Sequence, residues 1–349
     1  SPTNLYDLET TPEYRTLPAL DLPLLRENTS RFGFYVFSLT FVMSVLSYVT
    51  YQHLSGYEPV VYSRDIISTL ILARLRKATG LNLPIFHALH DFPGSMESGR
   101  IDTWRLIDGF VVNSNGLKDK VLDAGIQSNK LMVEYNGVDY GTFQASTSQD
   151  KLRKEYDLPL DRTIVGFTGN PYDYNGINVI LDLAEKMPEI HFVTVGGSGD
   201  RLQRLKDRKT NRQLKNLRIV PHQPHREIPR YLKAFDQLLL PLQPISERTK
   251  DFACPLKLFE YLASGRPIIA SDIPCLRDIV DDEKEALLVE YDNVEDYQEA
   301  VLRLSSDNKL NQQMSQAART LAENQTWENR AKRILDFIDQ RADVAAPTP

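Results

Sequence analysis

Cysteine and histidine are scarce in this chain of 349 residues, which holds two cysteines, Cys254 and Cys275, and six histidines. Two cysteines cannot form a disulfide framework, so a reducing compartment, the cytoplasm, is the expected location. No group of Cys and His has the spacing of a metal site, and no Asp-x-Asp motif follows a candidate strand of the first half. We therefore expect no catalytic metal, and no cofactor beyond a co-substrate.

Positive charge is not in excess. Lys and Arg number 41 against 47 Asp and Glu, which gives a net charge of −6. This balance argues against a nucleic-acid-binding protein that relies on bulk electrostatics. It leaves room for a local basic site that binds a phosphate.

Long apolar runs are missing except for one. Gly33–Gln52 contains no charged residue, and about 20 such residues are enough to cross a bilayer. The run is rich in Ser, Thr and Tyr, however, and no Lys/Arg clusters flank both of its ends. A buried helix is the preferred interpretation, and peripheral contact with a membrane surface and a true membrane span are the alternatives.

Short apolar runs alternate with amphipathic stretches of helical length almost throughout, which predicts βαβ units and parallel sheets. In the first half the expected strands are Pro59–Arg64, Ile85–His90, Gly109–Ser114 and Lys130–Asn136, with helices at Ile66–Lys77 and Gly116–Asp123. In the second half the expected strands are Thr163–Gly169, His191–Gly197, Leu217–His222, Gln237–Leu242, Pro267–Asp272 and Ala286–Tyr291. The helices expected there are Ile177–Lys186, Arg226–Ala234, Leu256–Ser264, Val294–Leu304, Leu310–Glu323 and Trp327–Arg341.

The fold class is therefore α/β, with two doubly wound domains that face a cleft. We expect an N-terminal domain over residues 1–140 and a C-terminal domain over 141–325. A helix at 326–341 would pack back on the first domain, and a frayed tail would follow at 342–349. Residues 1–32 are charged, rich in proline and without glycine. The N-terminal domain is expected to lack its first β-α-β unit, unless it is a reduced domain.

Three stretches carry a family pattern: Val111–Phe143, which contains NGVDYGTF; Pro255–Asp272, PLKLFEYLASGRPIIASD; and Ile273–Tyr291, which ends in ALLVEY. From about residue 59 to residue 335 the chain resembles the retaining glycosyltransferases of family 4. These enzymes are of the "glycosyl transferases group 1" type and have the GT-B fold of two Rossmann-like domains. The resemblance implies transfer of a sugar from a UDP- or GDP-sugar donor to a glycan, lipid or other acceptor hydroxyl.

The same resemblance implies a donor site in the C-terminal half. Glu260 would bind the ribose, because a carboxylate accepts hydrogen bonds from both ribose hydroxyls. A diphosphate needs cations and the N–H groups of a helix start, and Arg248, Lys250 and Lys257 are the candidate cations. The remaining expected donor contacts are Gly169, Asn170, Asn175, Gly197, His222, Asp251, Pro255 and Leu256. The plain alternatives are a solvated helix glutamate and ordinary loop charges.

The chain departs from the family at three positions. Many members carry an Arg where this chain has Asn170 and a Lys where it has Asn175. Phe252 stands where the first Glu of a frequent Glu-x7-Glu pair is found, and Asp251 lies one residue away. Either Arg248, Lys250 and Lys257 compensate for the lost cations, or donor binding is weak.

In the first half, His90 follows a candidate strand and resembles the histidine that the family places beside the reacting sugar. We expect His90, Lys257 and Arg248 to be the catalytic residues. Asn136, Gly137 and Asp139 of the NGVD segment are expected at a hinge between the domains. A strand-end histidine without a catalytic role is the alternative for His90.

Two other functions stay open: a catalytically weak GT-B protein that acts as a scaffold, and a GT-B nucleotide-sugar epimerase. An oxidoreductase is excluded by pattern, because no G-x-G-x-x-G follows a strand with an acidic residue about 20 positions later. A role in surface polysaccharide or glycolipid synthesis rests on the resemblance alone.

Overall fold

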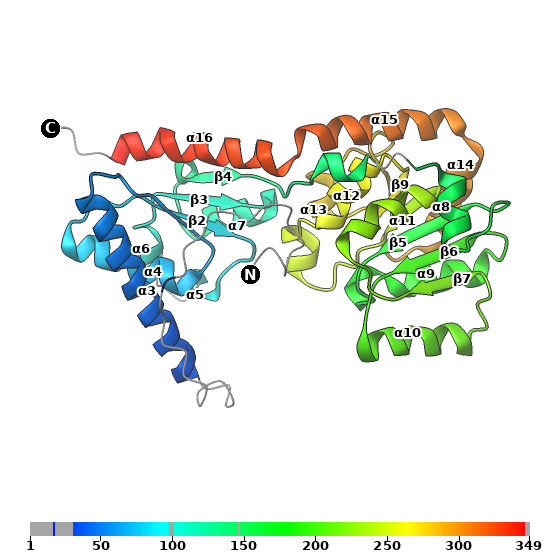
Figure 1. Ribbon diagram of the computed structural model, residues 1–349, viewed down its shortest axis with the longest axis horizontal. Helices are drawn as coiled ribbons and strands as arrows, with labels where there is room; N and C mark the ends of the chain where they lie inside the picture. The colour runs from blue at the N-terminus through cyan, green and yellow to red at the C-terminus, as the bar shows by residue number, and fades with distance from the viewer. Residues whose placement is uncertain (1–16, 18–30, 98–100, 145–146, 346–349) are drawn as a thin grey trace. The chain divides into compact units, whose positions relative to one another are not determined.

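The computed structural model describes residue 17 and residues 31–97, 101–144 and 147–345. Its apolar runs form two parallel sheets (Figure 1). The first sheet has the strand order β1-β2-β3-β4. Its strands are β1 (Val61–Ser63), β2 (Ile85–Leu89), β3 (Gly109–Val112) and β4 (Leu131–Val133). The helices of this half are α3 (Arg31–Leu54), α4 (Ile66–Thr79), α5 (Gly94–Glu97), α6 (Ile101–Trp104) and α7 (Asn115–Asp123).

The second sheet has six strands in the order β10-β9-β8-β5-β6-β7. Its strands are β5 (Ile164–Thr168), β6 (His191–Val195), β7 (Leu217–Val220), β8 (Gln237–Leu240), β9 (Ile268–Ser271) and β10 (Leu287–Val289). From β5 the chain adds β6 and β7 on one side, then β8, β9 and β10 on the other. The winding therefore reverses between β5 and β8, and such a reversal is where doubly wound sheets bind ligands.

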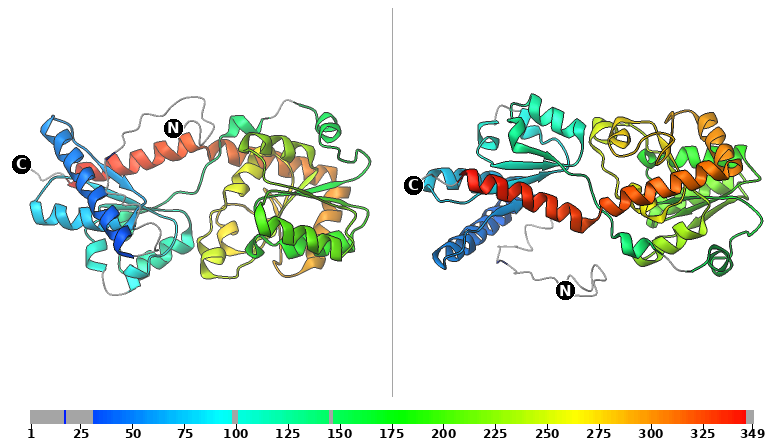
Figure 2. Two further views of the ribbon diagram at one scale, coloured as in Figure 1. Left: turned by 60° about the horizontal axis from the view of Figure 1, so that its bottom comes forward. Right: turned by 90° about the horizontal axis from the view of Figure 1, so that it is seen from above.

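Helices cover both faces of the second sheet (Figure 2). On one face α8 (Gln149–Glu155), α11 (Ile228–Ala234) and α12 (Leu256–Ser264) share one buried cluster with the sheet. On the other, α9 (Ile177–Lys186), α10 (Gly199–Asn211) and α14 (Val294–Ser306) share a second cluster. The chain continues through α13 (Pro274–Arg277), between β9 and β10, and ends with α15 (Asn308–Asn324) and α16 (Trp327–Ala345).

The described residues divide into two compact units. One takes in the chain up to residue 88, residues 94–110 and the residues from 340; the other takes in 89–93 and 111–339. The expected domain boundary at residue 140 and the packing of residues 326–341 stay predictions.

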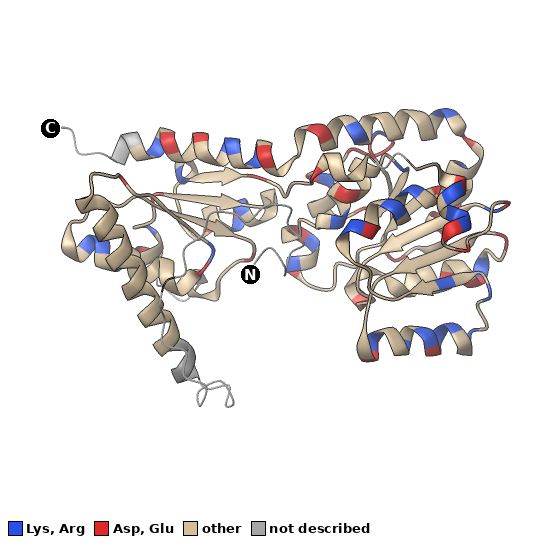
Figure 3. Ribbon diagram, in the orientation of Figure 1, with Lys and Arg blue, Asp and Glu red and all other residues tan. Residues whose placement is uncertain are grey.

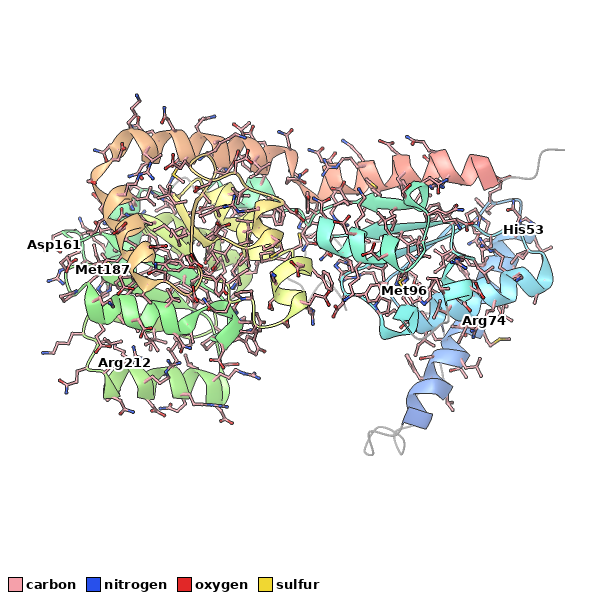
Figure 4. The ribbon with its side chains drawn as sticks, turned by 180° about the vertical axis from the view of Figure 1, so that it is seen from behind. His53, Arg74, Met96, Asp161, Met187 and Arg212 are labelled. Atoms are coloured by element: carbon pink, nitrogen blue, oxygen red, sulfur yellow. The ribbon has the colours of Figure 1, made fainter. Side chains whose placement is uncertain are left out.

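All ten expected strands are present, and α9 and α12 have the predicted bounds. The sequence interpretation missed α8, α10 and the short helices α5, α6 and α13. In α10 only Leu205 is buried, and most of the helix is polar or charged, so it has too few apolar residues to mark a core-facing side. It is held by polar contacts instead: Arg212, just after α10, forms an ion pair with Asp182 of α9, whereas Met187 at the end of α9 is fully buried (Figure 4).

The uncharged segment Gly33–Gln52 forms most of α3, but it is buried on one side only. Val42 and Val49 are buried, and α3 packs against α4. Leu39 and Met43 are 52% and 50% exposed. The expectation of a buried helix is thus wrong for the outer side of α3, which carries no charge along its described length (Figure 3). Among the described residues no helix has the length and apolarity to cross a membrane.

A glycine is required in the middle of β5. A Cβ atom at Gly166 would lie 1.9 Å from Cδ2 of the fully buried Phe235. We expect Gly166→Ala to lower the free energy of unfolding by about 1–3 kcal/mol, because it overpacks the core. Thermal or urea unfolding measures the change. Gly141→Ala is the matched control, since its Cβ would have nothing nearer than 3.7 Å; equal stability of the two variants would contradict the prediction.

Candidate donor site

The candidate site lies at the carboxyl ends of β5, β6 and β8, where the winding of the second sheet reverses. The loops after β5 and β6 pack directly against each other. A Cβ at Gly196 would lie 2.4 Å from the carbonyl oxygen of Gly169, and one at Gly197 would lie 2.7 Å from Cδ of Pro171. Gly169, Gly196 and Gly197 all have positive φ. Only glycine permits this close approach of two backbones.

Helix α12 is fixed to the end of β5 through Tyr261. The hydroxyl of this fully buried tyrosine accepts a 2.8 Å hydrogen bond from the backbone N–H of Thr168. Gly265 ends the helix in the left-handed conformation. Pro255 precedes the first turn without a side-chain cap, and Leu256 is 52% exposed. The N–H of Leu258 donates to the carbonyl of Pro255 at 3.0 Å, so the N–H groups of Leu256 and Lys257 and the positive end of the helix dipole are available to an anion.

Lys257, in the first turn of α12, reaches the loop after β5. Its Nζ donates a 2.7 Å hydrogen bond to Oδ1 of Asn175 and lies 4.7 Å from the ring centroid of Phe167. It also lies 3.1 Å from the Cβ position of Gly169. No carboxylate of a described residue lies within ion-pair distance of this ammonium. Burial lowers the pKa of Lys257 to about 7, against the smaller opposite effect of Glu260.

Asn175 uses both ends of its buried side-chain amide. Its Nδ2 donates a 2.8 Å hydrogen bond to the carbonyl of Asn170, while its Oδ1 accepts from Lys257. Gly176 follows with φ of 71° and caps the start of α9. The two asparagines thus lie in one loop, which is hydrogen-bonded to the lysine through Asn175. The contact between Asn175 and Lys257 could not be derived from the sequence, because 82 residues separate the two.

Glu260 lies one turn after Lys257 on α12. Its Oε1 is 3.0 Å from Nε2 of His225, in the 3-10 helix η4 (His225–Glu227). The hydrogen bond and charge of Glu260 raise the pKa of His225 more than burial lowers it. The sequence analysis assigned no role to His225, and no local signal marks it, since it lies 35 residues before Glu260.

The segment after β8 carries Arg248 and Lys250, which were expected to join Lys257 in one phosphate site. Arg248, Lys250, Asp251 and Phe252 lie in a single π-helical turn, η5 (Arg248–Phe252). Phe252 is 3% exposed, so this position fills the core and cannot present a carboxylate to a sugar. Arg248 and Lys250 are exposed. No hydrogen bond joins Arg248 or Lys250 to Lys257, so the structure assembles only part of the expected cation set.

A cavity elsewhere in this half does not suit an anionic donor. A cavity of about 470 Å³ opens beside β10. Its lining includes Asp272, Asp282, Glu283, Glu290, Asp296 and Glu299. Among the described residues there is also no cluster of three or more His, Cys, Asp or Glu that would hold a metal ion.

The part of the chain that carries the candidate donor site is similar to a known protein family. Residues 148–321 match the family model described as "Glycosyl transferases group 1". These residues therefore resemble a glycosyl transferases group 1 domain, and they are called the group 1 domain below. Every expected donor residue, from Gly169 to Glu260, lies inside this group 1 domain. His90 and the expected hinge residues lie outside it.

Two curated relatives share the region. D-inositol 3-phosphate glycosyltransferase of Corynebacterium urealyticum is 26% identical over 69% of this chain and 59% of its own length. The putative colanic acid biosynthesis glycosyl transferase WcaI of Escherichia coli is 26% identical over 46% of this chain and 39% of its own. The chain thus spans between two fifths and three fifths of these relatives.

A solved structure extends the likeness beyond the group 1 domain. Alr3699/HepE of Anabaena, in complex with UDP-glucose, superposes with a TM-score of 0.70 at 16% identity. The match covers 91% of this chain and 88% of that one. Together with the two parallel sheets, this confirms the predicted GT-B fold.

Outside the group 1 domain, His90 follows β2 and is half-buried. Asn136 donates to the carbonyl of Cys254 at 2.6 Å. A Cβ at Gly137 would lie 2.7 Å from the backbone nitrogen of Trp327. Asp139 accepts a 2.6 Å hydrogen bond from the hydroxyl of Thr142.

Inside the group 1 domain, Gly197, His222 and Pro255 lie in loops around the carboxyl ends of the sheet, where His222 N–H donates to the carbonyl of Gly197 at 2.9 Å. The catalytic, donor and hinge roles of these residues stay predictions.

Proposed function

We propose that this chain is a retaining hexosyltransferase of glycosyltransferase family 4, which moves a sugar from a nucleoside-diphosphate sugar to an acceptor hydroxyl. One observation carries the proposal: the ammonium of Lys257 has no carboxylate partner among the described residues and lies beside the backbone of Gly169 at the winding reversal of the sheet. A cation that is buried without a counter-ion is costly, and an anionic ligand offsets that cost. The donor diphosphate is such an anion.

Groups near Lys257 are suited to bind the other parts of the donor molecule. The uncapped start of α12 offers N–H groups to the diphosphate. Glu260, one turn on, offers a carboxylate to the ribose. The loop at Gly197 and His222 borders the place for the base.

The relatives support the chemical class of donor and acceptor. The complex of Alr3699/HepE with UDP-glucose supports a UDP-sugar, and GDP-sugar is the alternative. The name of WcaI, a putative colanic acid biosynthesis enzyme, supports an acceptor in polysaccharide synthesis, whereas the name of the other relative supports an inositol phosphate acceptor.

In the proposed reaction, the bond between the anomeric carbon and the diphosphate oxygen breaks. The acceptor oxygen forms its bond on the same face of the sugar, and its proton passes to the departing phosphate. Lys257 and the helix start stabilise the charge that develops on the leaving group. His90 would contact the sugar, and neither a pair of protein carboxylates nor a metal ion is required.

A nucleotide titration tests the proposal. We expect UDP or GDP to bind the intact chain in calorimetry, and the matching nucleotide-sugar to raise its melting temperature. Product analysis with an acceptor should find the anomeric configuration of the donor retained. No binding at millimolar concentration would favour the scaffold, and conversion of the donor without acceptor would favour the epimerase.

We further propose a cytoplasmic location with peripheral contact to a membrane surface through α3. Phe37, Leu39 and Met43 present exposed apolar side chains within the uncharged run Gly33–Gln52 of α3, which supports insertion at a bilayer interface. Replacing all three by serine should at least halve the fraction that floats with phospholipid vesicles. Leu335→Ser, at a 57% exposed position on α16, is the control. Equal flotation of the triple variant and the intact chain would contradict this proposal.

A further inference from the structure

His225, at the edge of the candidate donor site, contacts one carboxylate oxygen of Glu260 and does not contact the other. Nε2 of His225 lies 3.0 Å from Oε1 of Glu260. The side chain of Glu260 is 19% exposed and that of His225 is 66% exposed. The imidazole therefore covers the carboxylate from the solvent side.

His225 is itself held in place. Its ring meets the ring of Phe143 edge-on, with centroids 6.0 Å apart and an interplanar angle of 70°. Phe143 is 4% exposed and belongs to the core cluster that includes α12. The imidazole is thus fixed against the same body that carries Glu260, rather than against a mobile loop.

The second carboxylate oxygen has no such contact. Among the described residues, no donor lies within hydrogen-bond distance of Oε2 of Glu260. Lys257, one turn earlier on α12, donates to Asn175 and not to this carboxylate. A half-buried carboxylate with one satisfied and one open oxygen is suited to receive a hydroxyl from a ligand.

We propose that His225 is a positioning residue that fixes the Glu260 carboxylate so that it accepts hydrogen bonds from the donor ribose. The inference rests on the proposed function, and it assigns to His225 a role that acts through Glu260. A free glutamate side chain loses rotamer freedom when it binds, and an anchored carboxylate has lost it already. Fixing the Glu260 carboxylate should therefore increase the affinity for the ribose hydroxyls and leave the rate of the chemical step unchanged.

The experiment compares UDP with a UDP analogue that lacks both ribose hydroxyls. Calorimetric dissociation constants are measured for the intact chain, His225→Ala, His225→Gln, Glu260→Ala and the double variant His225→Ala/Glu260→Ala. We expect His225→Ala to weaken UDP about fivefold, the size of one hydrogen bond, and to leave the analogue unchanged. Glutamine at position 225 still offers an N–H donor and should restore most of the UDP affinity.

Two further readouts separate positioning from a general structural role. The His225→Ala change should have no effect on UDP in the Glu260→Ala background, because the histidine acts through that carboxylate. In turnover assays the donor KM should rise while kcat stays the same. His53→Ala, at an exposed position on α3, is the matched histidine control.

Each other outcome overturns the inference. Unchanged UDP affinity in His225→Ala shows that the anchor is not used. Equal losses for UDP and the analogue show that His225 acts on the diphosphate or on the fold. These results leave the proposed function standing, whereas failure of the intact chain to bind any nucleoside diphosphate overturns the proposed function itself.

Discussion

Lys257→Ala is expected to lower kcat/KM for the nucleotide-sugar by about 100-fold to 1,000-fold, the usual loss when one group that stabilises a developing anion is removed. No described residue gives the ammonium a counter-ion, and in the proposed function its removal leaves the departing diphosphate without the nearest positive charge. The side-chain partners left behind, Asn175 and Phe167, are neutral. Steady-state kinetics with a saturating acceptor measures the loss.

Two variants control this prediction. Lys257→Arg keeps the charge but cannot keep the single short contact with Asn175, so we expect an intermediate loss. Lys186→Ala removes a lysine whose ammonium pairs with Glu295 at the far end of α9, and it should keep full activity. Wild-type turnover in a folded Lys257→Ala protein would remove the phosphate role from this lysine.

Donor affinity is expected to fall as the pH rises above 7. The pKa of Lys257 is about 7 in the donor-free protein, because burial disfavours the ammonium. A bound diphosphate favours the ammonium and raises that pKa, so binding takes up a proton wherever the free lysine is neutral. Below pH 7 the charge is already present and affinity is constant. Above pH 7 the dissociation constant should rise by up to about tenfold per pH unit, until the pKa of the complex is reached.

Calorimetry in two buffers of different ionisation enthalpy measures this proton uptake directly. At pH 8 the apparent binding enthalpy should differ between the buffers, and at pH 6 the difference contributed by Lys257 should vanish. In Lys257→Gln the pH dependence above 7 should be lost, since no group remains there to titrate. A dissociation constant for UDP that stays level from pH 7 to pH 9 in the intact chain would contradict the prediction.

The sheets were predictable because their strands are short, nearly continuous runs of Val, Ile and Leu. The runs Gln237–Leu242 and Pro267–Asp272 contain β8 and β9, whose residues are almost all fully buried. Helix α12 was predictable to the residue, since its apolar side repeats at helical spacing and Gly265 ends it. Helix α10 was not, because its exposed face is charged and only Leu205 enters the core.

The candidate site was predictable one residue at a time but not as a set of contacts. Lys257 and Glu260 follow from a motif on one helix. Their partners, Asn175 and His225, come from other loops, and only the folded chain brings them together. The departure at Phe252 also has a structural reason, since the side chain of this residue is buried.

The loop that contacts Lys257 also affects the chemical stability of the protein, because it contains the dipeptide Asn175-Gly176. Asn175-Gly176 is the dipeptide that loses its side-chain amide most readily in flexible chains, when the glycine nitrogen attacks the asparagine side chain. Here that nitrogen donates to the carbonyl of Asp173 at 2.9 Å, and the amide is bonded at both ends. The native fold thus protects the dipeptide from deamidation. Protein stored partly unfolded would gain a carboxylate beside Lys257, and this carboxylate would pair with the ammonium in place of an anionic ligand.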